Sequence, residues 1–377
     1  MKIHLRKAGN GDSIQIDTNQ ANILVDGGTA KSFNSWYANE KLDSYDLIVV
    51  THIDDDHTNG ILKLLSDNKT PTIKQFWFNG IEQVLELPIE LSESNNRINK
   101  LKLQGLSADS ALHDENREIA FDEGASLSFI AKQTSTSINN VINGKTITRT
   151  SLPEYTDKDF KITIIGPTLH EISELKSIWI NELDRRDIKT KIIDKQYTTS
   201  FEKYLSSVKE KIESKDINSD KKKNTVENYA LRKNGKDDSL NNRSSISFVI
   251  ESNNKKILML GDCHMSTLYS WMDDNNLEEL EVDAVKLSHH GSKKNIDDLF
   301  FKKVKTKKYL ISTNGFRHRH PDLETICKIA HFKKTESNIK IFTNYDYSHL
   351  DAEILHEIEK EYINIDILFN YNHPIEV

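Results

Sequence analysis

The stretch from Thr51 to Gly60 constrains the fold of this chain more than any other, because two histidines and three aspartates occur within it. An apolar, β-branched run precedes it at 46–50, and apolar side chains at helical spacing follow from Ile61. We therefore predict that these polar groups lie on a loop between a strand and a helix that begins near Thr58. Imidazole and carboxylate groups together suit zinc or a harder ion such as Mn²⁺, whereas the plainer interpretation is an acidic turn that caps the helix.

Composition indicates a soluble chain that can bury a sizeable core. Its 377 residues suffice for one large domain or two ordinary ones, 29% of them are charged, and the formal net charge is −7. No apolar run approaches the length of a membrane span, and no signal-peptide pattern follows the N-terminus. The two cysteines form neither a disulfide framework nor a metal-binding pair, so we expect a reduced, cytoplasmic protein without a membrane partner. A nucleic-acid partner requires a locally basic surface on so acidic a chain.

Strand and helix patterns recur along most of the chain. The opening predicts an antiparallel meander, in which glycine-rich turns join three short strands. Strands are predicted at 2–6, 13–17, 21–25, 46–50, 73–78, 118–165 (several short ones), 245–250, 256–260, 282–288, 309–312, 339–342 and 363–369, and helices within 82–105, 322–332 and 350–361.

The segment 169–239 differs from the rest, since it is rich in Lys, Asp, Glu, Asn and Ser. Part of it is predicted to form an amphipathic helix, and 216–238 is predicted to be an exposed, mobile loop. The plain interpretation is a solvated insertion, and the alternative is a surface that binds a protein partner or covers the substrate. The apolar residues that keep helical spacing are Phe201, Tyr204, Leu205 and Val208.

Three later groups of polar residues each follow a predicted strand, as the first group does. They are Asp262, the pair His289 and His290, and the pair His318 and His320. Taken singly, each has a plain interpretation as a helix cap, a turn or a surface loop. Four such loops can converge, however, and together they supply the imidazoles and the bridging carboxylate that two metal ions need.

The order of these motifs resembles the metallo-β-lactamase superfamily, and within it the hydrolase domain of the DNA-uptake protein ComEC. The superfamily usually has the pattern His-x-His-x-Asp-His, and this branch replaces the second His by Asp, as residues 52–57 do here. The resemblance covers about 2–168 and 240–345. It implies a hydrolase domain over 1–345, interrupted by the insertion at 169–239 and followed by a helix-strand extension at 346–377. The segments that carry it are Ala8–Ser13, Ile23–Gly28, His52–His57, Leu260–Asp262, Lys286–Lys293 and Asn314–Pro321.

The resemblance implies an α/β (α+β) fold, a four-layer αββα sandwich in which two mixed sheets pack together with helices outside, plus the charged helical insertion. It also implies two divalent ions, Zn²⁺ or Mn²⁺, that share one bridging carboxylate. One departure stands out, because many members carry a further histidine before the bridging aspartate, and 241–245 contains none. The implied metal ligands are His52 and Asp54 for one ion, Asp56 and His57 for the other, Asp262 between them, and His290 or His289 completing the second position.

Metal chemistry then suggests a hydrolase, since two ions lower the pKa of a shared water toward ~7 and make it a nucleophile. The candidate catalytic residues are Asp56, as a ligand, and His318 and His320, of which one or the other is expected to orient a phosphate or protonate the leaving group. Positive charges and hydrogen-bond donors on the loops after His290 and Asn314 favour an anionic substrate, a phosphodiester such as a nucleic acid or nucleotide. A hydrolase of an ester, lactone or amide and a non-catalytic metal-binding regulatory module remain as alternatives. The predicted substrate-binding residues are Ser292, Lys293, Asn314 and Arg317.

Overall fold

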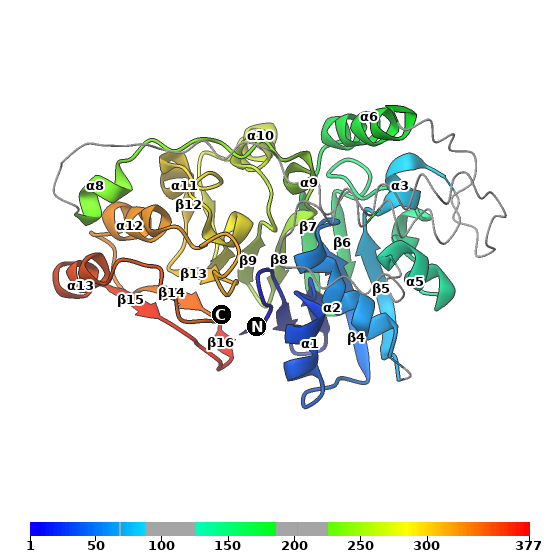
Figure 1. The fold of residues 1–377 in the computed structure, drawn as a ribbon, viewed down its shortest axis with the longest axis horizontal. Helices are drawn as coiled ribbons and strands as arrows, with labels where there is room; N and C mark the ends of the chain where they lie inside the picture. Colours follow the sequence, from blue (N-terminus) through cyan, green and yellow to red (C-terminus); the bar gives the residue numbers. More distant parts are fainter. Residues whose placement is uncertain (68, 88–125, 186–201, 203–224) are drawn as a thin grey trace.

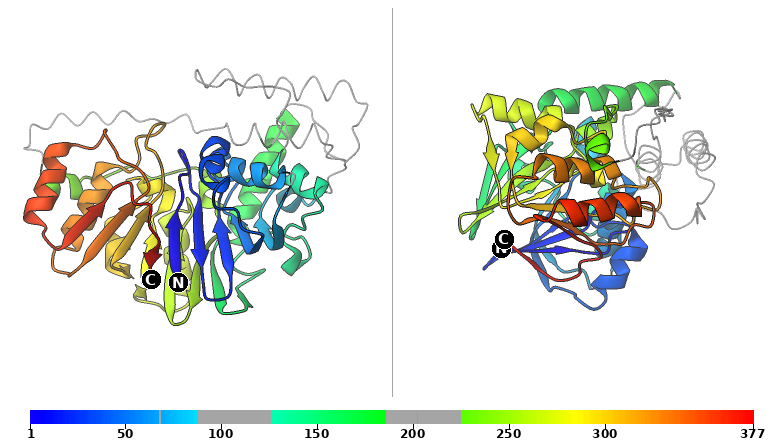
Figure 2. Two further views of the ribbon diagram at one scale, coloured as in Figure 1. Left: turned by 90° about the horizontal axis from the view of Figure 1, so that it is seen from below. Right: turned by 90° about the vertical axis from the view of Figure 1, so that its left-hand side faces the viewer.

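The computed structural model of this protein describes residues 1–67, 69–87, 126–185, 202 and 225–377. Two sheets of mixed strand direction face each other, and helices cover their outer faces (Figures 1 and 2). The four-layer αββα arrangement predicted from the sequence is thus confirmed. Within the described ranges, no helix has both the length and the apolar character needed to cross a membrane.

The first sheet consists of six strands, and the N-terminal meander forms its centre. The first three strands of the chain pair antiparallel, as predicted, and the next two run parallel to the third. In spatial order the strands are β16 (Ile375–Glu376), β1 (Lys2–Leu5), β2 (Ile14–Asp17), β3 (Asn22–Val25), β4 (Ser44–Val50) and β5 (Thr72–Phe78).

The second sheet consists of eight strands, and its parallel half carries the loops that matter for the site. In spatial order they are β15 (Ile365–Leu368), β14 (Ile339–Thr343), β13 (Lys308–Ile311), β11 (Ala284–Lys286), β9 (Lys255–Met259), β8 (Ser247–Ser252), β7 (Phe160–Gly166) and β6 (Glu154–Asp157). The strands from β9 to β15 run parallel, so the loops that follow them leave from one edge of the sheet. A separate short pair is formed by β10 (Leu280–Glu281) and β12 (Val304–Lys305).

Helices fall into two groups, one on each sheet. The first sheet is covered by α1 (Ala30–Tyr37), α2 (Asp55–Leu65), α3 (Ile81–Leu85), α5 (Leu127–Gln133) and α6 (Leu169–Arg185). The second sheet is covered by α8 (Val226–Ala230), α10 (Met265–Asp274), α11 (Asp298–Lys303), α12 (Leu323–Phe332) and α13 (Ala352–Glu361). The short helices α9 (Leu240–Arg243), η1 (Asn140–Ile142) and η2 (Ser288–Gly291) lie in connections.

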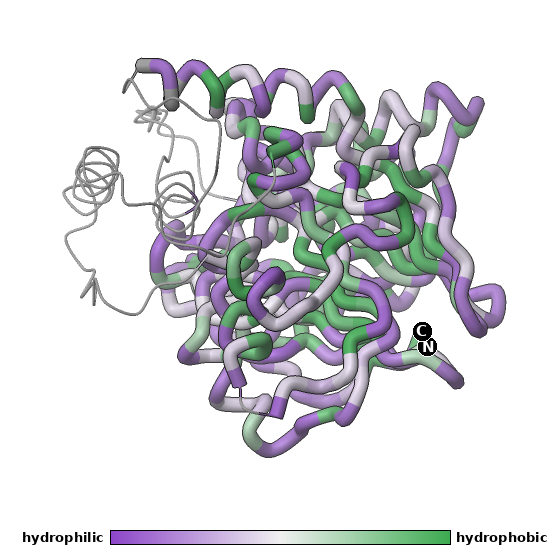
Figure 3. Tube along the Cα trace, turned by 90° about the vertical axis from the view of Figure 1, so that its right-hand side faces the viewer, coloured by the Kyte–Doolittle hydropathy of each residue, from purple (hydrophilic) through white to green (hydrophobic). Residues whose placement is uncertain are grey.

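The core follows from the two-residue period of the strands. In β4, Leu47 and Val49 face the opposite sheet, whereas Ile48 and Val50 face the helices. All four side chains are fully buried. Because both faces of such a strand are covered, it consists of a continuous apolar run rather than an alternating pattern. Figure 3 shows the resulting apolar interior and the polar turns around it.

Three predictions about elements need correction. Helix α2 begins at Asp55, not near Thr58, because Asp54 adopts the extended cap conformation and acidic residues in the first turn favour a helix N-terminus. Residues 127–133 form a helix, not a strand, since the Ser126 hydroxyl accepts from the N–H of Phe129 and caps it.

The third correction concerns the predicted mobile loop at 216–238. Residues 226–230 form α8, whose Val226 and Ala230 are fully buried in the core of the second sheet. The backbone N–H of Val226 also donates to Glu357 of α13. The predicted amphipathic helix around Phe201 and Tyr204, and the predictions for 88–105, 118–125 and 216–224, lie outside the described residues.

The C-terminal tail, expected to be an extension, contributes one strand to each sheet. β15 pairs with β14 in the second sheet, and β16 pairs with β1 in the first, where Ile375 lies opposite Ile3. Figure 2 shows the two chain ends side by side. The residues after 345 therefore belong to the sandwich itself.

Candidate metal centre

The candidate site lies where loops from the two sheets meet. β4 leads into His52 and α2, β9 leads into Asp262, and β11 leads into the turn at 288–291. β9 and β11 are parallel neighbours, so their carboxyl ends lie at the same edge. The N–H of Ile246 donates to the carbonyl of Thr51 over 2.8 Å, which joins the two sheets beside the site.

Asp262 is the centre of this site and is almost fully buried. Four imidazoles direct their Nε2 atoms at its Oδ2 atom: those of His57 and His290 lie 3.6 Å away, and those of His52 and His289 lie 3.9 Å away. Such separations are too long for hydrogen bonds. They suit a cation held between carboxylate and imidazole, since zinc bonds to these groups are about 2.0–2.2 Å long.

Two further carboxylates join the group, each beside a different histidine. Asp54 Oδ2 lies 3.6 Å from His52 Nε2, and Asp56 Oδ2 lies 3.8 Å from His290 Nε2. All seven metal ligands implied by the sequence are thus brought together. They gather around Asp262, with Asp54 beside His52 and Asp56 beside His290.

Three of the histidines are held by a carboxylate on the opposite ring nitrogen. A partner of this kind fixes the ring and directs the other nitrogen at the metal. The pairs, measured from Nδ1 to the nearest carboxylate oxygen, are His57 with Asp26 at 2.8 Å, His290 with Asp12 at 3.2 Å, and His289 with Asp237 at 3.2 Å. Two of these nitrogens have a nearer partner as well, since the Ser312 carbonyl lies 2.9 Å from His290 Nδ1 and Asn295 Oδ1 lies 3.0 Å from His289 Nδ1. For the fourth, His52, the Nδ1 partner is the hydroxyl of Thr51 at 3.1 Å.

The chemistry of the buried atoms fits a divalent cation. Among the described residues, His52 Nε2, His57 Nε2 and Asp262 Oδ1 have no hydrogen-bond partner. Leaving a buried polar atom unpaired costs about 1–3 kcal/mol. A cation that binds the two imidazoles and the carboxylate would remove that cost, so these residues are suited to hold one.

Asp12 also lies close enough to be a ligand, since one of its atoms is within 4.8 Å of ligand atoms of His57, Asp262 and His290. Its two oxygens are engaged elsewhere, however. One forms an ion pair with the buried Lys286, and the other faces His290 Nδ1. We therefore assign Asp12 to orienting His290 and not to binding the ion.

Electrostatics inside the site are dominated by these contacts. Burial disfavours charge on Asp262, yet the neighbouring imidazoles of His290 and His57 hold the pKa of its carboxyl well below the usual range. Burial also opposes protonation of His57 and His289, but nearby carboxylates prevail. They hold the pKa of His57 well above its ordinary value and raise that of His289 to about 9. These carboxylates thus favour positive charge at the site.

The late loop at 314–320 extends outward from this centre. The ring of His320 lies 5.2 Å from that of His289, and the ring of His318 lies 6.1 Å from that of His320. Burial lowers the pKa of His320, and the nearby imidazole of His289 lowers it further. The carboxylate of Asp322 has the opposite effect, which does not prevail. His318 and Arg317 are exposed, and the neighbouring Phe316 is 85% exposed.

The other predicted substrate-binding residues have partners within the protein. Lys293 Nζ lies 3.3 Å from a carboxylate oxygen of Glu324, and Asn314 Oδ1 accepts from the N–H of Phe316. Ser292 is buried, and its hydroxyl accepts from the N–H of Lys294. These residues shape the loops at the site, whereas Arg317 and Arg319 of the late loop are exposed.

Sequence reasoning missed the residues that orient the histidines. Asp12 and Asp26 lie in the glycine turns that carry the family resemblance, so their position offered a signal. Asp237 had none, because it belongs to the charged insertion and resembles the many acidic residues around it.

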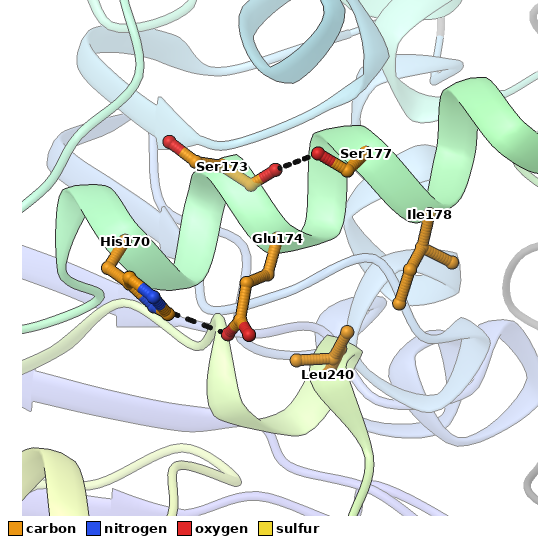
Figure 4. Close-up of a pocket in the computed structure, with 6 residues that line it drawn as sticks. All are labelled: His170, Ser173, Glu174, Ser177, Ile178 and Leu240. Carbon is orange, nitrogen blue, oxygen red and sulfur yellow. Dashed lines mark hydrogen bonds and ion pairs between the residues drawn. The ribbon is translucent and has the colours of Figure 1, made fainter.

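A hollow of about 330 Å³ lies away from this site, between α6 and α9 (Figure 4). His170 and Glu174 on α6 form an exposed ion pair at its rim, and Leu240 closes one side. None of the implied metal ligands lines the hollow. Its exposed pair does not resemble the buried group around Asp262, so we place the chemistry at the latter.

One known protein family matches part of the chain. The model of the metallo-β-lactamase superfamily matches residues 6–75, which include β2, β3, β4 and the motif at 52–57. Together with the two mixed sheets and their flanking helices, this match gives the chain the metallo-β-lactamase fold. No curated protein sequence matches the chain.

Similar solved structures include the metallo-β-lactamase fold protein YhfI from Bacillus subtilis, at 9% identity and a TM-score of 0.38, with 100% of this chain and 99% of that chain covered. Zn²⁺-bound PqqB from Methylobacterium extorquens is 11% identical, with both chains fully covered and a TM-score of 0.38. A metallo hydrolase from Ignicoccus hospitalis is 10% identical, with 100% and 98% coverage and a TM-score of 0.34. These are distant likenesses, and the fold assignment rests on the matched segment and the sheets.

Proposed function

We propose that this protein is a metal-dependent hydrolase that holds two divalent ions and cleaves a phosphodiester. The observation that carries the proposal is the convergence of four imidazole Nε2 atoms on Asp262 Oδ2, with three buried ligand atoms left without hydrogen bonds among the described residues. Divalent ions at such a site supply a water that is nucleophilic at neutral pH. The resemblance to the ComEC hydrolase domain, together with the matched superfamily segment, supports this choice.

The late loop supports an anionic substrate. Arg317, His318 and Arg319 are exposed on it, although the chain as a whole carries a net charge of −7. Phe316, at the same tip, presents a bare aromatic face of the kind on which nucleobases stack. A single-stranded nucleic acid or a dinucleotide would therefore find both a charge partner and a stacking surface beside the centre.

The two histidines of this loop suit different tasks. The lowered pKa of His320 makes it neutral at pH 7, so it orients a substrate oxygen by hydrogen bonding. His318 is exposed to solvent and stands farther out, where it is better suited to protonate a leaving group. Asp56, as a ligand, and these two histidines are the catalytic residues of the proposal.

A second candidate is a hydrolase of a carboxylic ester or lactone. The observation that favours it is the pairing of Lys293 with Glu324, which compensates one of the positive charges predicted to bind a phosphate. The two candidates share the metal chemistry and differ in what the loops bind.

A metal-supplemented substrate panel tests the proposal. The protein, loaded with Zn²⁺ or Mn²⁺, is assayed on single-stranded DNA, RNA, cyclic dinucleotides, a simple aryl phosphodiester, and aryl esters and lactones. We expect chelator-sensitive turnover of phosphodiesters. We also expect its near-complete loss in Asp262→Asn, because an amide lacks the charge that holds two cations together. The exposed Asp273→Asn variant is the control and keeps full turnover.

Kinetics of loop variants then separate binding from chemistry. Arg317→Glu should mainly raise KM, because a phosphate contact acts alike on ground and transition states, and His318→Ala should mainly lower kcat. Lys302→Glu, at an exposed position on α11, is the charge-matched control. Turnover confined to esters or lactones, with phosphodiesters untouched under every metal condition, would replace the first candidate by the second.

A further inference from the structure

Residues 231–242, which we name the strap, run from the end of α8 into α9 and pass the metal centre on the way. Figure 1 shows this segment running from α8, over the second sheet's helices, to α9. At its start, Lys328 donates to the carbonyl of Ala230 and Arg232 pairs with Glu324. Just beyond its end, Arg243 pairs with Glu174 of α6. The strap is thus tied to helices on both halves of the molecule.

Between these ties the strap contacts the metal centre through Asp237. The Asp237 side chain is only 9% exposed, and its Oδ2 atom lies 3.2 Å from His289 Nδ1. The same oxygen accepts from the side-chain amides of Asn242 at 2.8 Å and Asn295 at 2.9 Å. His264 Nε2 lies 3.6 Å from the same oxygen. Asn295 in turn contacts His289, because its Oδ1 atom lies 3.0 Å from His289 Nδ1.

His289 needs such support because its backbone is unusual. Its φ is 46° and that of His290 is 55°, so two consecutive non-glycine residues adopt the left-handed conformation. Strain of this kind persists only where surrounding contacts impose it. In this turn, the left-handed conformation directs the Nε2 atoms of both histidines at Asp262 Oδ2, although the planes of the two rings are inclined by 68°.

The strap also contacts Asp54, which the family resemblance pairs with His52 as a ligand of one ion. Asn241 Nδ2 lies 3.2 Å from Asp54 Oδ1, while the next residue, Asn242, lies 3.4 Å from His289 Nδ1. Neighbouring strap residues thus contact Asp54 and His289, which places these two ligands on the same side of Asp262. His57 and His290 instead belong, with Asp262 and Asp12, to the group whose ligand atoms all lie within 4.8 Å of one another.

We propose that Asp237 is a positioning residue of the metal centre, which holds His289 as a ligand of the ion bound by His52 and Asp54. The arrangement compensates for the histidine that is missing at 241–245, where this chain has Asn241 and Asn242 instead. It gives part of the charged insertion a definite task. The inference rests on the metal centre of the proposed function but not on its substrate.

The test is metal affinity, measured by competition with a chromophoric chelator on the full chain, with Zn²⁺ and Mn²⁺ as probes. The Asp237→Asn variant should bind one of the two ions about 10–100-fold more weakly and the other unchanged, which is the usual effect of removing a partner of a metal-binding histidine. His289→Ala should weaken the same ion. The control is Asp238→Asn, because Asp238 is the adjacent, exposed aspartate, and both affinities should stay at the wild-type value.

A double variant distinguishes positioning from a general structural role. If Asp237 acts through His289, adding Asp237→Asn to His289→Ala should produce no further loss of affinity. If Asp237 only anchors the strap through Asn242 and Asn295, its variant lowers the melting temperature but leaves both affinities intact, and the proposal is wrong. Full additivity of the two losses contradicts it as well. Asp237→Glu, which keeps the charge, should lose less than tenfold and serves in place of Asp237→Asn if that chain does not fold.

Failure of this inference is distinguishable from failure of the proposed function. Wild-type protein that binds two ions but cleaves no phosphodiester refutes the substrate and leaves the role of Asp237 open to the same affinity test. Wild-type protein that binds less than half an equivalent of either ion refutes the metal centre, and with it this inference.

Discussion

At the scale of single residues, the site is decided by which nitrogen of each histidine faces Asp262. The sequence names the histidines, because they follow predicted strands, but it does not assign their nitrogens. That choice depends on partners such as Asp12, Asp26 and Asp237, each of which is distant in sequence from the histidine that it contacts. A pattern of local spacing carries no information about such partners. The side chains that gather around Asp262 were therefore foreseeable, whereas of the orienting carboxylates only Asp12 and Asp26 had a signal, from their glycine turns.

These charges predict how the metal-free protein responds to pH. The carboxylates around His289 overcome its burial and raise its pKa to about 9, above the ordinary value of 6.5. A raised histidine pKa contributes stability that is fully present below about 6.5 and is lost as pH rises through about 9. We expect the melting temperature of chelator-treated protein to fall across this window, and His289→Gln to flatten the fall. His170→Gln, at an exposed position, should leave the profile as it is. A wild-type profile that is flat from pH 6.5 to 9 would contradict the assignment.

At the scale of elements, helix α2 packs closely against two glycine turns, one at Gly27 and Gly28 and the other at Gly11. The N–H of Gly60 donates to the carbonyl of Gly28, and that of Gly27 donates to the carbonyl of His57, both over 2.9 Å. A Cβ atom on Gly60 would lie 2.0 Å from the Gly27 oxygen, and one on Gly11 would lie 1.7 Å from the Asp56 oxygen. The sequence indicated turns at these glycines. It did not reveal that the turns make room for α2, because that contact joins residues more than thirty positions apart.

Gly60→Ala should therefore destabilise the fold by about 1–3 kcal/mol or more, since the close neighbour is backbone and cannot move aside. Because α2 carries Asp56 and His57, metal affinity should fall with it. Denaturant unfolding monitored by circular dichroism measures the first effect. Gly235→Ala is the matched control, because nothing lies within 4 Å of its added carbon. Equal stability of the two variants would show that α2 is not held by this contact.

At the scale of the whole molecule, the tail closes the sandwich. The order of layers was predictable from apolar runs and from the family resemblance. The place of residues 346–377 was not, because the resemblance ends near 345 and the strand that pairs with Ile375 is at the other end of the chain. Pairing over such a distance leaves no local mark in the sequence.

The tail should accordingly contribute to global stability. Ile375 is 2% exposed between the two sheets, and Ile375→Ala should cost about 2 kcal/mol or more through the cavity it leaves. Ile363→Ala removes the same atoms from a side chain that is 87% exposed, and should cost almost nothing. Thermal and denaturant unfolding of the pair measure the difference. A loss for Ile375→Ala no larger than that for Ile363→Ala would place the tail outside the cooperative unit.

The ligands of the metal centre come from both halves of the sandwich, with His52 to His57 following a strand of the first sheet and Asp262 to His290 following strands of the second. Neither half alone offers a complete set. A newly made chain would therefore bind the proposed ions tightly only after the later half has docked on the earlier one. Ion uptake would then mark the last step of maturation and would make that step harder to reverse, because separating the halves would require releasing the ions first.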